Sequence, residues 1–83
     1  MNIFITRLKE LRKSKNVTQK QTAEEIDIAE RQYQKYELGE NKPSYDVLIA
    51  LADYFGVSLD YLVGRSDEPT VHGKTEREHR TTL

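Results

Sequence analysis

The stretch 19–38 constrains this chain most, because its polar and apolar residues fit two short helices joined by a tight turn. Thr18 and Gln21 match a capping box, in which the side chain of each accepts a hydrogen bond from the backbone amide of the other. A helix is therefore predicted to begin just after Thr18 and to end near residue 25. Asp27 stands in the turn, where the chain needs an unusual backbone angle. A second helix then runs to Gly39, which ends it.

Three more helices are predicted around this pair. Phe4, Leu8 and Leu11 form a helical stripe in the segment 3–15, and Asn16 can take the left-handed conformation that ends a helix. Serine caps and terminal glycines bound two further apolar segments. They are Ser44 and Gly56 for the fourth helix, and Ser58 and Gly64 for the fifth. Long alternating runs typical of strands are absent from the sequence, so an all-α fold, a compact five-helix domain, is predicted.

The composition fits one small domain followed by a polar tail. The chain has 83 residues, of which 36% are hydrophobic, and this suits a single thin core. Helical patterning stops after the fifth helix, so residues 1–64 are predicted to form the domain and 65–83 a flexible tail. His72 and His79 fall in that tail without a fixed scaffold, so we interpret them as surface groups and not as metal ligands.

Several classes of protein are excluded by what the sequence lacks. It contains no cysteine, which rules out disulfides and cysteine-bound zinc. No apolar run is long enough for a signal peptide or a membrane span, so a cytoplasmic protein is expected. Neither a Ser/His/Asp set, nor a glycine-rich phosphate loop, nor a carboxylate cluster with metal spacing occurs. We therefore predict neither an enzyme nor a bound cofactor.

The distribution of charge is more informative than the net charge of −1. Residues 1–20 carry +5, residues 21–63 carry −6, and residues 64–83 are neutral. A basic end on a nearly neutral chain is a pattern that a small DNA-binding protein can use. The alternative is an ordinary solvated helix face, and charge alone slightly favours that alternative.

A series of short motifs, in order along the chain, resembles the Cro/C1-type, XRE-like family of phage and bacterial repressors. The resemblance covers about residues 3 to 64. The motifs are Thr18-Gln19 before the second helix, the Ile26-Asp27-Ile28 turn, Tyr36-Glu37-Leu38-Gly39, Asn41-Lys42-Pro43-Ser44, and the segment 51–62. The resemblance implies a five-helix domain whose third helix lies in the DNA major groove. It also implies a dimer on a near-palindromic operator, with half-sites about 34 Å apart.

Three positions depart from the usual pattern of that family. Thr22 stands where the family usually has leucine, Asp27 where it has glycine, and Ala29 where it has a serine or threonine cap. Ala29 is a poor N-cap, so the third helix has a weaker start than the second. These departures bear on the stability of the domain and the geometry of the turn more than on its function.

The third helix carries the predicted base contacts. Tyr33 and Tyr36 point inward at helical spacing, which leaves four long polar side chains on the outward face. They are Glu30, Arg31, Gln34 and Lys35. The two basic side chains can donate to guanine, the glutamine can pair with adenine, and the glutamate can accept from cytosine. Alternatively some of them are merely solvated, and Glu30 can instead repel phosphate and select against wrong registers.

Residues around this face are predicted to contact phosphate. They are Thr18, Gln19, Lys20, Gln32, Asn41 and Lys42. For Gln19 the resemblance implies a phosphate or base contact, and each lysine has the alternative of an ordinary solvated charge. The resemblance also implies an ion pair between Arg12 and Glu37, which would hold the first helix against the third. The alternative is two exposed charges.

The partners predicted are double-stranded DNA and a second copy of the chain. The fifth helix, with Leu59, Leu62 and Val63, is the best candidate for the dimer surface. Tyr45, Tyr54 and Tyr61 are predicted to be core or rim residues, although Tyr45 could reach a phosphate. The function predicted is a sequence-specific DNA-binding transcriptional regulator, a repressor, that reads the major groove of a near-palindromic operator with the third helix. The alternative is an antitoxin or accessory protein-interaction module that retains the helix-turn-helix, and the acidic middle segment is compatible with it.

Overall fold

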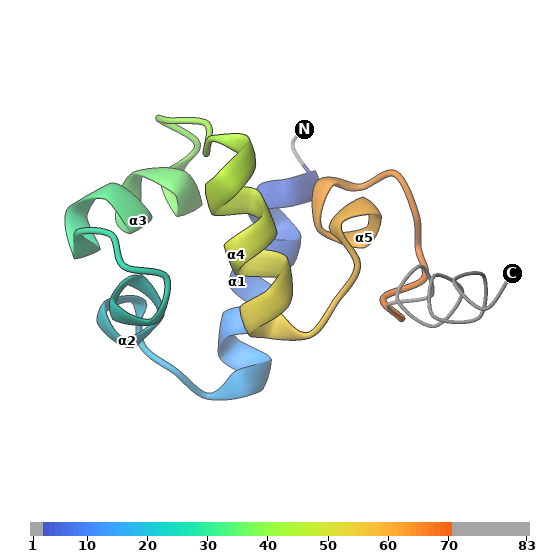
Figure 1. The fold of residues 1–83 in the computed structure, drawn as a ribbon, viewed down its shortest axis with the longest axis horizontal. Helices are drawn as coiled ribbons and strands as arrows, with labels where there is room; N and C mark the ends of the chain where they lie inside the picture. The colour runs from blue at the N-terminus through green and yellow to red at the C-terminus, as the bar shows by residue number, and fades with distance from the viewer. Residues whose placement is uncertain (1–2, 71–83) are drawn as a thin grey trace, which may run out of the picture.

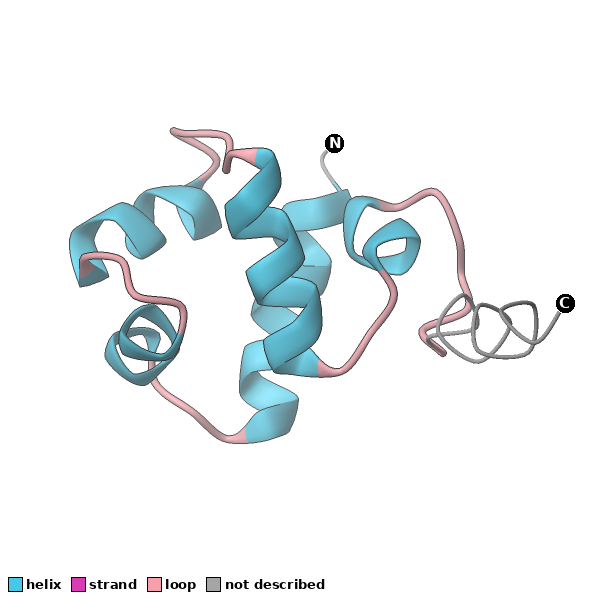
Figure 2. Cartoon of the chain, in the orientation of Figure 1, coloured by secondary structure: helices cyan, strands magenta, loops and turns pink. Residues whose placement is uncertain are grey.

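The computed structural model describes residues 3–70, and within these residues the chain forms five helices (Figures 1 and 2). They are α1 (Ile3–Lys15), α2 (Gln19–Glu25), α3 (Glu30–Leu38), α4 (Tyr45–Phe55) and α5 (Leu59–Val63). The predicted all-α, five-helix class is confirmed. The observed helix bounds agree with the predicted ones to within a residue. Figure 1 shows α1 and α4 crossing in the middle of the molecule, with α2 and α3 at one end and α5 at the other.

Local capping explains where the helices start. The side chains of Thr18, Ser44 and Ser58 each accept a hydrogen bond from a backbone amide three residues on. These bonds satisfy amides that have no partner inside the helix. Ala29 precedes α3 and makes no such bond, as its side chain predicts. The start of α3, which was predicted to be weak, therefore lacks the side-chain cap that α2, α4 and α5 have.

Residues with a positive φ angle follow α1, α3, α4 and α5, and another lies in the turn between α2 and α3. Asn16 and Asp27 are the described non-glycine residues with positive φ, both at 61°. Asn16 follows α1, and Asp27 lies between α2 and α3, where the unusual angle was predicted. Gly39 has φ of 78° after α3, and a Cβ at this position would approach Ile5 Cδ1 to 2.8 Å. This glycine therefore allows both the backbone angle and the close approach of α1.

The core is small and draws on every helix. Its fully buried large side chains include Leu8 of α1, Tyr33 of α3, Leu51 of α4 and Leu62 of α5. Each such leucine contributes roughly 1.5–3 kcal/mol by leaving water. Thr22 of α2 is also fully buried, and its hydroxyl donates to the carbonyl of Thr18 at 2.9 Å. The polar group that replaces the expected leucine is therefore satisfied within its own helix.

The burial of Leu62 corrects one prediction about the dimer surface. This side chain has no exposed area, because it is part of the hydrophobic core of the domain. It cannot contact a second subunit while the domain is folded. Leu59 and Val63 are half-buried, so of the three predicted dimer residues only these two retain surface for a partner.

The three tyrosines of α4 and α5 have different environments. Tyr45 is 67% exposed and does not belong to the core or its rim, so that part of the prediction is wrong for this residue. It is the first residue of α4. Tyr54 is half-buried beside Phe55, with the Lys15 ammonium 4.9 Å from its ring centroid. Tyr61 is half-buried and lies beneath a guanidinium of α1.

That guanidinium belongs to Arg7, which binds the segment after α5. Arg7 Nη1 donates to the carbonyls of Tyr61 and Ser66, each at 2.6 Å, and Nη2 donates to Asp67 Oδ1 at 2.9 Å. The amide of Ser58 donates to the carbonyl of Pro69 at 3.0 Å. Residues 65–70, assigned to the polar tail by the sequence, thus contact α1 and α5. The rest of the predicted tail, with both histidines, lies outside the described residues.

Candidate nucleic-acid interface

Local hydrogen bonds at the start of α2 and in the turn after it fix the geometry of the α2–α3 pair. Thr18 Oγ1 accepts from the amide of Gln21 at 3.0 Å, and Gln21 Oε1 accepts from the amide of Thr18 at 2.8 Å. This is the predicted capping box. After α2 the amide of Ile28 donates to the carbonyl of Ala23 at 3.0 Å. Ala23 is fully buried, where its small side chain allows the two helices to approach.

The inward side of α3 holds this helix in place. Tyr33 has no exposed area, Tyr36 is 3% exposed and Glu37 is 4% exposed. The prediction that both tyrosines point inward is therefore confirmed. A buried carboxylate is costly unless hydrogen bonds and an opposite charge compensate for its lost hydration. Glu37 is consequently the residue whose partners decide whether α3 is held firmly.

Glu37 receives hydrogen bonds from three different helices. Arg12 of α1 donates through Nε to Oε2 at 2.6 Å and through Nη2 to Oε1 at 3.3 Å. Gln19, the first residue of α2, donates to Oε1 at 3.0 Å, and the hydroxyl of Tyr33 donates to Oε2. The ion pair implied by the family resemblance is thus present. Arg12 also donates to the carbonyl of Val17 at 3.1 Å, just before α2.

These contacts set the protonation of the cluster formed by Arg12, Gln19, Tyr33 and Glu37. Burial by itself would raise the pKa of the Glu37 carboxyl, but the hydrogen bonds from Arg12, Tyr33 and Gln19 outweigh it and lower the pKa below its ordinary value. Burial, reinforced by the bond to Glu37, raises the pKa of the Tyr33 hydroxyl. Glu37 therefore stays charged and Tyr33 stays a donor at neutral pH, and α1, α2 and α3 are tied at one point.

The outward side of α3 presents polar side chains to solvent. Glu30, Arg31 and Gln32 are exposed, whereas Gln34 and Lys35 are half-buried. The structure thus places the four predicted base-contact residues on the same helix, opposite its buried tyrosines. Two outward side chains have partners on α3: Gln34 Nε2 donates to Glu30 Oε2 at 3.3 Å, and Gln32 Nε2 donates to the hydroxyl of Tyr36 at 2.6 Å.

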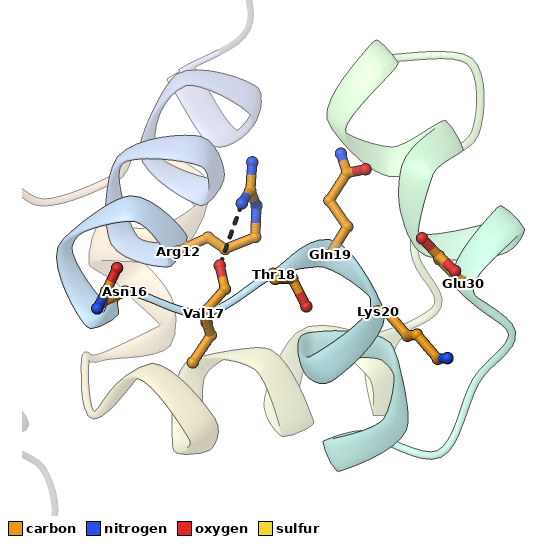
Figure 3. A pocket seen from close by; sticks show the side chains of 7 residues that line it. All are labelled: Arg12, Asn16, Val17, Thr18, Gln19, Lys20 and Glu30. Atoms are coloured by element: carbon orange, nitrogen blue, oxygen red, sulfur yellow. Dashed lines mark hydrogen bonds between the residues drawn. The ribbon is translucent and has the colours of Figure 1, made fainter.

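Of the six predicted phosphate contacts, Gln32 lies on α3 itself and the other five fall into two groups. Thr18, Gln19 and Lys20 lie at the start of α2 and help to line an open hollow of about 470 Å³. Figure 3 shows Arg12 and Gln19 reaching toward the same space from α1 and from the start of α2. The Thr18 hydroxyl and the Gln19 amide are already engaged by the cap and by Glu37. Asn41 and Lys42 are separate from this group and are exposed on the loop between α3 and α4.

A second hollow is lined in part by Lys9, a residue that the sequence did not single out. It has a volume of about 270 Å³ and is lined by Lys9, Gln19, Gln34, Glu37 and Leu38. Lys9 is one of the basic residues that give residues 1–20 their positive charge. The positive charge of residues 1–20 was the one signal in the sequence that pointed to Lys9. The apolar stripe of α1 does not show which of the cations on this helix faces α3. Leu38 is 67% exposed at the end of α3.

The described residues lack two kinds of feature. None of the helices within residues 3–70 combines the length and the apolar character needed to cross a membrane. Over the same residues, no group of three or more histidine, cysteine, aspartate or glutamate side chains could hold a metal ion.

Comparison with known proteins decides the family. A family model described as helix-turn-helix matches residues 8–62, which is most of the described domain. The chain belongs to the Cro/C1-type helix-turn-helix family of transcriptional regulators. The helix-turn-helix of this chain, formed by α2 and α3, is its DNA-binding element. The family assigned from the sequence motifs is thereby confirmed.

Two curated relatives illustrate the match. The chain is 40% identical over 77 residues to the uncharacterized HTH-type transcriptional regulator YobD of Bacillus subtilis, covering 93% of this chain and 67% of YobD. It is 46% identical over 59 residues to the cryptic phage CTXphi transcriptional repressor RstR of Vibrio cholerae, covering 71% of this chain and 53% of RstR. The chain thus spans about two thirds of the former and about half of the latter. Both are named as regulators and neither as an enzyme.

Solved structures agree with the fold. A transcriptional regulator from Listeria innocua superposes with a TM-score of 0.73 at 30% identity, over 99% of this chain and 77% of that one. ComR from Streptococcus suis superposes with a TM-score of 0.67 at 29% identity, over 80% of this chain but 22% of ComR. The helix-turn-helix domain of this chain is therefore shared with longer regulators.

Proposed function

We propose that this chain represses transcription by binding a near-palindromic operator as a homodimer, with α3 in the major groove of each half-site. The observation that carries the proposal is the division of α3 into two sides. Tyr33, Tyr36 and Glu37 are buried and hydrogen-bonded, so the helix cannot rotate without breaking the cluster. Its other side offers Glu30, Arg31, Gln34 and Lys35, whose donors and acceptors match the edges of bases.

Residues flanking α3 supply the phosphate contacts in this proposal. Lys20 stands at the start of α2 and Lys42 on the loop after α3, so cations lie on both sides of the recognition helix. Thr18, Gln19, Gln32 and Asn41 add polar groups beside them. Such contacts orient a protein on the duplex and supply most of its salt-dependent affinity, while base contacts supply the choice of sequence. The basic α1 adds long-range attraction for DNA.

The printed names of relatives support repression. RstR is a phage transcriptional repressor, and 46% of the aligned residues are shared with it. The name of a more distant relative, BcrR of Enterococcus faecalis, is that of a transcriptional activator, at 31% identity. A reporter gene placed behind the bound site separates the two, because a repressor lowers its expression and an activator raises it.

The direct test is selection of bound duplexes from a random-sequence pool, followed by mobility-shift titration of the winner. We expect a near-palindromic site and an affinity that falls steeply with salt. Arg31→Ala should cost about 1–3 kcal/mol and relax preference at one base position. Lys42→Ala is the matched control, since loss of a phosphate contact should weaken all sites alike and reduce the salt slope by about 1. The proposal is refuted if the folded wild-type protein enriches no sequence from the pool.

A further inference from the structure

The hydrogen bond between Glu30 and Gln34 distinguishes these two residues from the other outward side chains of α3. They are four positions apart, so they lie on the same face of the helix, and Gln34 Nε2 donates to Glu30 Oε2 at 3.3 Å. Arg31 and Lys35 form the next pair at this spacing, and within residues 3–70 neither side chain has a hydrogen-bond or ion-pair partner. Gln34 is thus the one predicted base contact on α3 whose donor group is already directed by a neighbour.

This bond restricts what the Gln34 amide can offer to a base. A glutamine amide has two N–H donors and one oxygen acceptor. With one N–H given to Glu30, the amide plane is oriented, and one donor and the acceptor remain. Gln34 also lines the hollow that it shares with Gln19 and Glu37, and its side chain is half-buried.

One remaining donor and one acceptor match adenine better than guanine. Adenine presents an acceptor at N7 and a donor at N6 in the major groove, whereas guanine presents two acceptors, N7 and O6. A glutamine that is free to use both N–H groups can serve either base. One that shares an N–H with Glu30 can fully serve only adenine, and the Glu30 carboxylate nearby would repel the acceptor edge of guanine.

We infer that Glu30 is a positioning residue that orients the Gln34 amide, so that this position of the operator is read as adenine and guanine is rejected. The inference rests on the proposed function, because it assumes that α3 reads the major groove. It gives Glu30 a role through its neighbour instead of a direct contact with cytosine. Glu30 lies on the first turn of α3, at the edge of the hollow near the start of α2 (Figure 3).

The experiment measures base preference in the selected operator with four variants. Gln34→Ala first identifies the position that Gln34 reads, as the one where adenine preference disappears. At that position Glu30→Ala should lower the ratio of adenine to guanine affinity by about fivefold, while preferences elsewhere stay unchanged. Glu30→Gln retains an acceptor for the Gln34 amide, so its ratio should lie closer to wild type than that of Glu30→Ala. Mobility-shift titrations on paired duplexes supply the ratios.

Glu40→Ala is the matched control for charge. Glu40 is exposed on the loop after α3, so its removal should raise affinity for every duplex alike and leave the adenine-to-guanine ratio unchanged. The inference is overturned if Glu30→Ala keeps the wild-type ratio at the Gln34 position, or if it changes preference at a different position, which would make Glu30 a base contact. If the wild-type protein selects no sequence at all, the proposed function fails together with the inference.

Discussion

Two arginines of α1 brace opposite ends of the molecule, and they do so in different ways. Arg12 binds the buried carboxylate of Glu37 and so holds α3, while Arg7 binds backbone carbonyls and the exposed carboxylate of Asp67 after α5. The Glu37 side chain is 4% exposed, whereas Asp67 is fully exposed. A buried charge depends on every one of its partners, but an exposed charge can turn to water. We therefore expect the two braces to fail very differently.

The largest effect is expected at the buried end. Glu37→Gln removes the charge that Arg12 faces and disturbs the bonds from Gln19 and Tyr33, so the free energy of unfolding should fall by roughly 3 kcal/mol. Urea unfolding followed by circular dichroism measures this loss. The control is Glu40→Gln, which removes an exposed carboxylate nearby and should leave stability unchanged within error. A loss for Glu37→Gln as small as that of the control would show that the cluster does not hold α3.

The second prediction concerns acid. Because the folded-state pKa of Glu37 lies below its ordinary value of 4.5, the charged form is stabilised by folding. This contribution is fully present above the unfolded pKa and is lost as the pH falls through the lowered, folded pKa. Wild-type stability should therefore decline in that acid range more steeply than that of Glu37→Gln. Parallel slopes for the two proteins, measured by urea unfolding at several pH values, would assign the acid sensitivity to other carboxylates.

The smallest effects are expected at the exposed end. Arg7→Ala removes two carbonyl contacts and the guanidinium that lies 4.0 Å from the centroid of the Tyr61 ring, so stability should fall by about 1–2 kcal/mol. Asp67→Asn, its matched control, should cause no measurable change, because an ion pair in full contact with water contributes little. Chemical unfolding compares the two. An equal loss for both would mean that the Asp67 contact, and not the carbonyls, holds this segment.

Much of the fold could be predicted because its signals are local. The caps at Thr18, Ser44 and Ser58 act over three residues, so the sequence alone contains both partners of each bond. The inward direction of Tyr33 and Tyr36 follows from helical spacing. The outward face of α3 follows from the same spacing, which is why the candidate base-contact residues could be named before the structure was known. The pairing of Arg12 with Glu37 came from resemblance to a family.

Distant contacts were not predictable in this way. Arg7 meets Tyr61 and Ser66 across separations of 54 and 59 residues, and nothing in the sequence near Arg7 indicates those carbonyls. Leu62 was assigned to a dimer surface, because the apolar stripe of a five-residue helix does not reveal which partner covers it. Tyr45 was placed at the core for the same reason. Its aromatic side chain continues the pattern of α4, although the core ends before that turn.

The sequence by itself therefore determined the five helices, their ends, and the two sides of α3, since each depends on residues within a turn or two of one another. The tertiary structure alone decided that Arg7 binds the segment after α5, which apolar residues of α5 remain at the surface, and that the Gln19 side-chain amide donates to Glu37. Those outcomes depend on how helices distant in sequence pack, and packing is settled by the shape and charge of the whole domain together.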